Sequence, residues 1–334
     1  MKKRFSLGTY AFSGGVAVAT LVGCGGSQPP IGARAALPQT YALATHEDRG
    51  TSWMLPEAAQ DDLLYAANAN ANTVSVYSYS KRGLVGTLDA EGPAGECVDK
   101  KGDVYVTEGT KILEYAHGGT QPIATLNIGG DNAWACSVDF KSGALGVADF
   151  GNDYSTGFIA VFKNGVETTY TTSSIYYVLG CGYDDHGNLL ISGYVAPGNY
   201  SNLAFAMLSR GRNKLTSVAL PFEDWPNIAA IQWDGSYWAA TVPIQHREEI
   251  MYRFSIENQT AKLEGKTLLS HDDGYAGQTW IIRRRVGLEQ RTRIVGAVGP
   301  AGEVEYWNYP SGKRFASISD SGYPLGVTVS LAHH

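Results

Sequence analysis

Histidine and serine most often supply acid–base or nucleophilic chemistry, and this sequence offers few arrangements of them that could react. The seven histidines occupy positions 46, 117, 186, 246, 271, 333 and 334. They form no HxH or HExxH pair, and no GxSxG nucleophile elbow is present. We therefore assign no catalytic histidine, and the sequence predicts neither a catalytic base nor a nucleophile.

Cysteine is the next candidate for chemistry. Cys97, Cys136 and Cys181 each lie in a short apolar segment that precedes an Asp-and-Gly turn. Three cysteines allow three pairings and leave one over. Counted from the following Asp, Cys136 and Cys181 share a register and Cys97 is shifted by one residue, which reverses the face to which a strand residue points. No CxxC zinc motif occurs. We interpret the three as buried thiols, with room for one disulfide.

Arginine is concentrated in one segment. Residues 281–293 contain five arginines, Arg283, Arg284, Arg285, Arg291 and Arg293. Such a group could contact an anion or a polysaccharide, because guanidinium groups pair well with carboxylates and sulfates. We favour the alternative, in which the segment is a β-hairpin at the rim of the fold and its arginines pair with acidic residues elsewhere in the chain.

Aromatic and polar residues gather in the segments that lead into the expected inner strands described below. The aromatic candidates are Trp134, Tyr176, Tyr177, Trp225, Tyr275 and Tyr323, and polar residues such as Asp131, Asp273 and Asp320 accompany them. Tyrosine and tryptophan combine a broad apolar face with a polar tip, which suits recognition surfaces that stay in contact with water. If these segments share one mouth of a ring, they predict a binding rim.

The composition indicates which elements must position these residues. Charged residues make up 17% of the 334 residues, while the chain has 40 glycines and 20 tyrosines. This profile is typical of a β protein with many tight turns. With a formal net charge of −6, the chain does not resemble a basic nucleic-acid binder, and no nucleic-acid partner is expected.

The amino terminus has the pattern of an export signal. Lys2, Lys3 and Arg4 precede a mildly apolar stretch, and Leu21-Val22-Gly23-Cys24 resembles a bacterial lipobox. We expect a signal peptide over residues 1–23, lipidation at Cys24 with palmitate-type acyl chains, and a tether over residues 24–60. The expected location is a lipid-anchored protein of the cell membrane or outer membrane, facing the periplasm or the exterior.

The body of the chain consists of imperfect repeats. Four of the repeats place an Asp before a Gly in a turn between two strands, at Asp99, Asp139, Asp184 and Asp234. Second strands are expected near residues 63, 103, 145, 189, 237 and 293, and four short strands over about 40–45 residues make a propeller blade. The sequence thus predicts an all-β fold, a six-bladed β-propeller over residues 61–334. We expect the carboxy-terminal strand at Leu325 to close the first blade beside Leu63.

Two family resemblances follow from these motifs. The stretch Pro93-x-Gly95 followed by Gly102-Asp103-Val104-Tyr105-Val106 resembles the NHL/YncE-like repeat of exported bacterial propellers. Glu91-Gly92-Pro93 and Pro226-Asn227 more weakly resemble the SMP-30/gluconolactonase pattern, which implies an axial calcium or zinc ion. By that resemblance Glu91, Asn132 and Asn227 are the metal ligands, with Asp272 as a loose substitute for the missing acid. The first resemblance fixes no activity, because this scaffold carries many functions.

From the sequence we expect a binding or scaffold module that needs no cofactor and whose rim recognises an envelope glycan, peptide or protein. The alternative is a divalent-metal-dependent lactonase-like or lyase-like hydrolase, in which the axial cation polarises a carbonyl or activates water.

Overall fold

The computed structural model describes residues 52–152, 155–196, 199–220, 230–244, 248–270, 276–286, 289–298, 301–320 and 322–332. The expected signal peptide (1–23), Cys24 and the tether as far as residue 51 lie outside these residues. Four candidate site residues also lie outside them, namely Trp225, Asn227, Asp272 and Tyr275.

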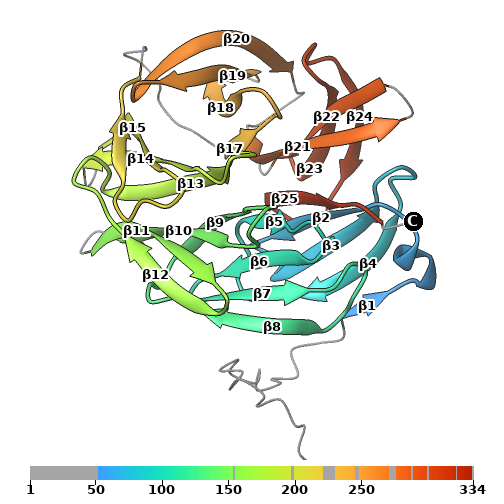
Figure 1. Cartoon of the computed structure of the whole chain (residues 1–334). Helices are drawn as coiled ribbons and strands as arrows, with labels where there is room; N and C mark the ends of the chain where they lie inside the picture. Colours follow the sequence, from blue (N-terminus) through green and yellow to red (C-terminus); the bar gives the residue numbers. More distant parts are fainter. Residues whose placement is uncertain are drawn as a thin grey trace, which may run out of the picture. The chain divides into compact units, whose positions relative to one another are not determined.

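The described chain forms six antiparallel sheets arranged as the blades of a closed propeller (Figure 1). In blade 1 the order from the outer edge inwards is β1 (Trp53–Met54), β4 (Leu84–Asp89), β3 (Thr73–Ser78), β2 (Leu63–Asn68) and β25 (Pro324–Ser330). A short 3₁₀ helix, η1 (Pro56–Ala59), connects β1 to β2. The six-bladed fold predicted from the repeats is confirmed.

The other blades each contain four consecutive strands, of which the first is innermost. Blade 2 contains β5 (Glu96–Val98), β6 (Val104–Glu108), β7 (Lys111–Tyr115) and β8 (Pro122–Asn127). Blade 3 contains β9 (Ala133–Val138), β10 (Leu145–Asn152), β11 (Ser155–Lys163) and β12 (Val166–Tyr170). Blade 4 contains β13 (Tyr177–Tyr183), β14 (Leu189–Ala196), β15 (Asn199–Leu208) and β16 (Thr216–Val218). Blade 5 contains β17 (Ala230–Trp233), β18 (Trp238–Ile244), β19 (Glu248–Glu257) and β20 (Thr260–Ser270). Blade 6 contains β21 (Ala276–Val286), β22 (Glu289–Val298), β23 (Glu303–Asn308) and β24 (Arg314–Ser319).

The Asp-and-Gly turns join the inner strand of a blade to its second strand, as predicted. Asp184 Oδ1 accepts the N–H groups of His186 and Asn188, each at 2.8 Å, and Gly187 has a φ of 82°. The Asp side chain replaces backbone hydrogen bonds inside the turn, while glycine tolerates the positive φ. Equivalent aspartate-to-backbone bonds occur at Asp99, Asp139 and Asp234. We call the end of the ring that carries these turns the turn face.

The carboxy terminus closes the ring. β25 pairs antiparallel with β2, with Thr328 opposite Tyr65 and Ser330 opposite Leu63 (Figure 1). This contact gives the first blade its inner strand and leaves no unpaired inner edge on β2. The predicted closure is therefore confirmed.

An apolar cluster fills each junction between neighbouring blades, so the core is distributed around the ring. Trp280, on the inner strand of blade 6, packs against the clusters between blades 6 and 1, blades 1 and 2, and blades 2 and 3. An inner-strand residue can reach all three junctions only by lying across the centre of the ring. Gln278 of the same strand accepts hydrogen bonds from the N–H groups of Glu96 and Val327. Side chains from β21 thus occupy the middle of the ring.

One disulfide links two neighbouring blades. Cys97 of β5 and Cys136 of β9 are bonded, and their Cα atoms lie 5.6 Å apart. Cys181 of β13 is buried and free, and burial raises the pKa of its thiol to about 12. A thiol with so high a pKa is almost entirely protonated at neutral pH and is a poor nucleophile.

Candidate functional site

Four aromatic side chains form a continuous ladder where blades 3 and 4 meet. The ring centroids of Trp134 and Phe150 are 6.0 Å apart, and those of Phe150 and Tyr177 are 4.7 Å apart and nearly parallel. Tyr176 meets Tyr177 edge to face at 4.8 Å. These separations fall in the range in which aromatic rings attract one another. The structure thus brings together three of the predicted rim residues, Trp134, Tyr176 and Tyr177.

The antiparallel order of the strands explains this meeting. Trp134 lies near the start of β9, and Phe150 lies near the end of β10, beside the pair Asp149–Ala133. Tyr177 is the first residue of β13, the inner strand of the next blade. The start of an inner strand and the end of its second strand lie at the same end of the blade. We call this end, opposite the turn face, the mouth face.

The ladder runs from solvent into the core. Trp134 is 37% exposed, Phe150 and Tyr176 are half-buried, and Tyr177 is fully buried. Tyr177 therefore supports the stack from below, and the surface available to a ligand is formed by Trp134 with the edges of Phe150 and Tyr176. Sequence reasoning missed Phe150. The signal was present, because an aromatic residue at the end of a second strand opens onto the same face as the segments before the inner strands.

A buried carboxylate holds the loop beside the ladder in place. Asp149 accepts hydrogen bonds from the N–H of Asn132 at 3.0 Å and from the N–H of Gly151 at 2.9 Å. Burial raises the pKa of Asp149, although these two backbone bonds oppose the rise. The amide of Asn132 donates to the carbonyl of Gly151 at 3.2 Å, and that of Asn152 donates to Asp131 at 3.4 Å. The loop before Trp134 is thus fixed in position by polar contacts.

Tyr323 lies elsewhere on the mouth face, in the segment that leads into β25 of blade 1. Nearby Asp320 accepts hydrogen bonds from Asn68 at 3.2 Å and from the hydroxyl of Tyr77 at 3.1 Å. The mouth face therefore carries a second polar and aromatic region where blades 6 and 1 meet, separate from the ladder of blades 3 and 4.

The candidate metal ligands within the described chain lie in different blades. Glu91 is exposed in the segment before β5 of blade 2, and Asn132 lies before β9 of blade 3. No group of three or more His, Cys, Asp or Glu side chains within the described ranges is arranged to hold a metal ion.

The arginine-rich segment forms the hairpin of β21 and β22, as predicted. Arg283 Nη1 lies 3.0 Å from Asp185 Oδ2, so this arginine pairs with an acid of the turn face. The Arg293 guanidinium lies 4.5 Å from the ring centroid of Phe315. The Arg283 contact is the expected pairing with an acid, whereas Arg293 packs on an aromatic ring.

Comparison with known proteins identifies the architecture. A chain from the crystal structure of a nidogen/laminin complex superposes with a TM-score of 0.61 at 13% identity, over 82% of this chain and 99% of that one. A protein of unknown function from Bacteroides caccae gives a TM-score of 0.57 at 10% identity, over 81% and 99% of the two chains. Kuenenia stuttgartiensis hydrazine synthase gives a TM-score of 0.54 at 14% identity, over 83% of this chain and 94% of that one. The likeness is one of fold. At these identities it carries no information on ligand or activity.

No protein-family model matches the sequence, and no curated protein matches it. Within the described part of the chain, no helix has the length and apolar character needed to cross a membrane.

Proposed function

We propose that this protein is a binding module whose mouth face recognises a glycan, peptide or protein of the bacterial envelope. The observation that carries the proposal is the ladder that ends in Trp134. A large indole is exposed at the surface, supported by stacked rings, and flanked by fixed polar groups. Exposed aromatic residues on a rigid base are typical of binding hot spots.

The groups around the ladder favour recognition over catalysis. The Asp149 carboxylate is engaged by two backbone N–H groups, and its chemical role is to hold the loop. The exposed indole instead offers an apolar face, and Asp131 and the backbone of the loop offer hydrogen bonds at its edge. Such a surface binds a partner with mixed apolar and polar character.

We further propose that the module is a lipoprotein of the NHL/YncE-like kind, attached to the membrane through acyl chains on Cys24. The lipobox-like residues before Cys24 and the basic start of the chain support this. Replacing Cys24 with Ser should abolish incorporation of a palmitate analogue in cells and leave an unprocessed precursor. A variant labelled as strongly as the parent would refute the anchor.

The ladder is tested by retention of the purified protein on isolated envelope glycan and on immobilised envelope proteins. Trp134→Ala should lose retention while keeping its fold. Phe140→Ala is a matched control, because Phe140 is 46% exposed and lies in the β9–β10 turn of the same blade, on the turn face. If Trp134→Ala and Phe140→Ala are retained equally strongly on every fraction, the mouth face is not the binding site.

A further inference from the structure

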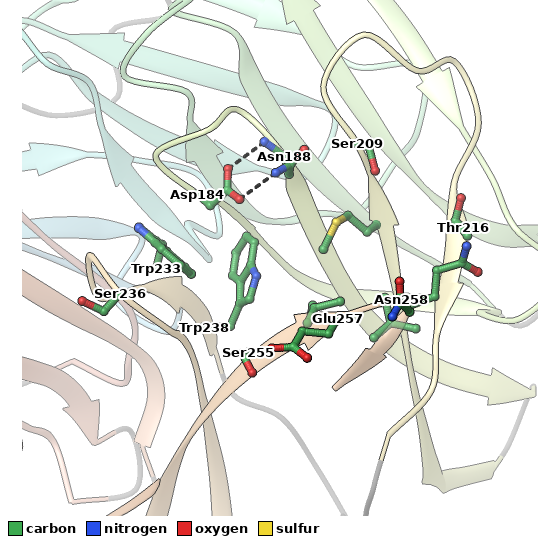
Figure 2. Close-up of a pocket in the computed structure, with 14 residues that line it drawn as sticks. Asp184, Asn188, Ser209, Thr216, Trp233, Ser236, Trp238, Ser255, Glu257 and Asn258 are labelled. Carbon is green, nitrogen blue, oxygen red and sulfur yellow. Dashed lines mark hydrogen bonds between the residues drawn. The ribbon is translucent and has the colours of Figure 1, made fainter. Parts of the chain in front are cut away.

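A pocket of about 460 Å³ opens between blades 4 and 5 on the turn face (Figure 2). The aromatic ladder lies at the opposite end of the ring. Its walls come from the β13–β14, β17–β18 and β19–β20 turns and from the facing ends of β15 and β16. Small-molecule sites commonly measure roughly 300–1,000 Å³. The pocket therefore has the size of a ligand site.

Two tryptophans form the aromatic part of the pocket. Trp233 and Trp238 flank the β17–β18 turn and face each other across the two strands, with ring centroids 5.4 Å apart at 68°. Trp238 is buried and forms the floor, whereas Trp233 is half-buried and stands beside it (Figure 2). The pair offers an indole surface to any molecule that enters.

A contact from blade 4 fixes the orientation of Trp233. The indole Nε1 donates to Asp185 Oδ2 at 2.9 Å, and the same carboxylate pairs with Arg283 of blade 6. Burial tends to raise the pKa of Asp185, but the hydrogen bonds from Arg283 and Trp233 prevail and lower it. The acceptor is therefore ionised at neutral pH, and one carboxylate joins blades 4, 5 and 6. The indole is held before any ligand arrives.

The opposite end of the pocket is lined by amides on a strained turn. Asn258 and Gln259 form the two-residue β19–β20 turn, with φ of 50° and 63°. The equivalent turn of blade 3 is Asn164-Gly165, the sequence that such turns favour. Blade 5 keeps the backbone conformation but places a glutamine where glycine would be unstrained. Strain of this kind is typical of sites where a side chain is needed for function.

Blade 4 holds this turn in position. The carbonyl of Gln259 accepts the N–H of Ala219, and the carbonyl of Ala219 accepts the N–H of Ala261, each at 2.8 Å. These backbone bonds cross from blade 4 to blade 5 just outside the pocket. Asn258 and Gln259, which both line the pocket, therefore stand on a rigid wall. Figure 2 shows Asn258 at the other end of the pocket from Trp233 and Trp238.

The charge of the lining selects the kind of ligand. The lining contains hydroxyls from Ser209, Thr216 and Ser236. Among the lining residues within the described part of the chain there are two carboxylates and no lysine, arginine or histidine. Asp184 is buried and occupied by the N–H groups of its own turn, and Glu257 is exposed at the edge. The carboxylates of Asp184 and Glu257 would disfavour an anionic ligand by like-charge repulsion. A neutral molecule rich in hydroxyls would meet matching hydroxyls and amides.

From these features we propose that the pocket between blades 4 and 5 binds a neutral oligosaccharide. A pyranose ring has one face of C–H groups that can lie on an indole and an edge of hydroxyls that can bond to the amides of Asn258 and Gln259. This site goes beyond the proposed function, because it lies on the other face and shares no residue with the aromatic ladder.

The test is calorimetric titration of the purified full-length protein with neutral hexasaccharides built from glucose, xylose, mannose or N-acetylglucosamine. A uronic-acid hexasaccharide and a mixed peptide digest serve as comparison ligands. We expect at least one neutral sugar to bind and to quench the fluorescence of Trp233, and the uronic-acid sugar to bind more weakly. Trp233→Ala should weaken binding of the neutral sugar by roughly tenfold or more.

A second variant separates binding from folding. Replacing Asn258 and Gln259 together by Gly removes both amides and suits the positive φ values, so stability should be kept while affinity falls. The matched control is Asn164→Gly in the corresponding turn of blade 3, which should leave affinity unchanged. Trp134→Ala should also bind the sugar normally. Failure of the mouth-face proposal can therefore be distinguished from failure of the sugar-pocket proposal.

Three results would overturn the proposal. The first is that no neutral hexasaccharide binds at millimolar concentration. The second is that the uronic-acid sugar or the peptide digest binds in place of the neutral sugars. The third is that the double glycine variant and Asn164→Gly bind the sugar equally well.

Discussion

Gln278 of blade 6 forms hydrogen bonds to both backbone groups of Glu96 in blade 2. Its Nε2 donates to the Glu96 carbonyl at 2.7 Å, and its Oε1 accepts the Glu96 N–H at 3.0 Å. The same Oε1 accepts the N–H of Val327 in blade 1 at 3.1 Å. One side chain thus satisfies backbone groups on the inner strands of two other blades, in the way that an additional strand would.

Gln278→Ala should therefore destabilise the whole ring. Three backbone groups at the centre would lose their partner, and an unsatisfied buried polar group costs about 1–3 kcal/mol. We expect a fall of at least about 2 kcal/mol in the unfolding free energy measured by urea denaturation. Gln121→Ala is the control, because Gln121 is exposed in the β7–β8 connection of blade 2. Equal stability of the two variants would show that Gln278 does not brace the ring.

Glu96 should make stability depend on pH in the direction opposite to that of an ion-paired acid. Burial raises the pKa of its carboxyl well above 4.5, the nearby charge of Asp320 adds to the rise, and the amide of Thr328 opposes it. The folded protein then keeps a proton that the unfolded chain releases, so the free energy of unfolding falls as pH increases above about 4.5. Glu96→Gln should be more stable than the parent at pH 8 and should lose less stability between pH 5 and pH 8.

The measurement is urea denaturation at several pH values across that range. Glu57→Gln is the control, because Glu57 is exposed in η1. Parallel pH profiles for the parent and Glu96→Gln would contradict a raised pKa at Glu96.

The repeats were sufficient to predict the fold, because Asp-and-Gly turns impose hairpins wherever they occur. The strands joined by Asp99, Asp139, Asp184 and Asp234 lie where the sequence placed them. The candidate site was predicted only in part. Trp134, Tyr176 and Tyr177 were identified, but Phe150 and the burial of Tyr177 depend on how one blade packs on the next. The same reason hid Gln278 and Trp280, since nothing in a strand pattern tells how far a side chain reaches across the ring.

The disulfide is a packing detail that could be predicted only in part from the sequence. Successive strand residues point to opposite faces, so the one-residue shift of Cys97 turns it toward blade 3, and Cys136 points back toward blade 2. Both belong to the cluster between these blades, whereas Cys181 belongs to the cluster between blades 3 and 4. The register was visible in the sequence, but the pairing needed the blade order around the ring.

Reduction of the Cys97–Cys136 bond should lower stability without exposing Cys181. The bond closes a loop with a sequence separation of 39 residues, and such a cross-link typically contributes roughly 2–4 kcal/mol. The Cys97→Ser/Cys136→Ser variant should melt at a lower temperature and lose its sensitivity to dithiothreitol. Cys181→Ala should remain sensitive to dithiothreitol. A parent protein whose melting temperature is the same with and without dithiothreitol would contradict this bond.

Truncation of Trp134 should cost much less stability than truncation of Tyr177, although both residues belong to one ladder. Tyr177 is fully buried, so Tyr177→Ala removes core packing and should cost roughly 3–5 kcal/mol of unfolding free energy. Trp134 is 37% exposed, and its indole rests on Phe150 without being enclosed. Trp134→Ala should therefore cost no more than about 1 kcal/mol, in the range of a partly exposed contact.

Urea denaturation of both variants tests this difference, with Phe150→Ala expected between them because its ring is half-buried. A binding surface must present a side chain whose contacts are incomplete in the free protein, since the ligand completes them. If Trp134→Ala lost as much stability as Tyr177→Ala, the indole would already be fully packed in the free protein. The ladder would then be a plug between blades 3 and 4, and the mouth face would no longer be a candidate for ligand binding.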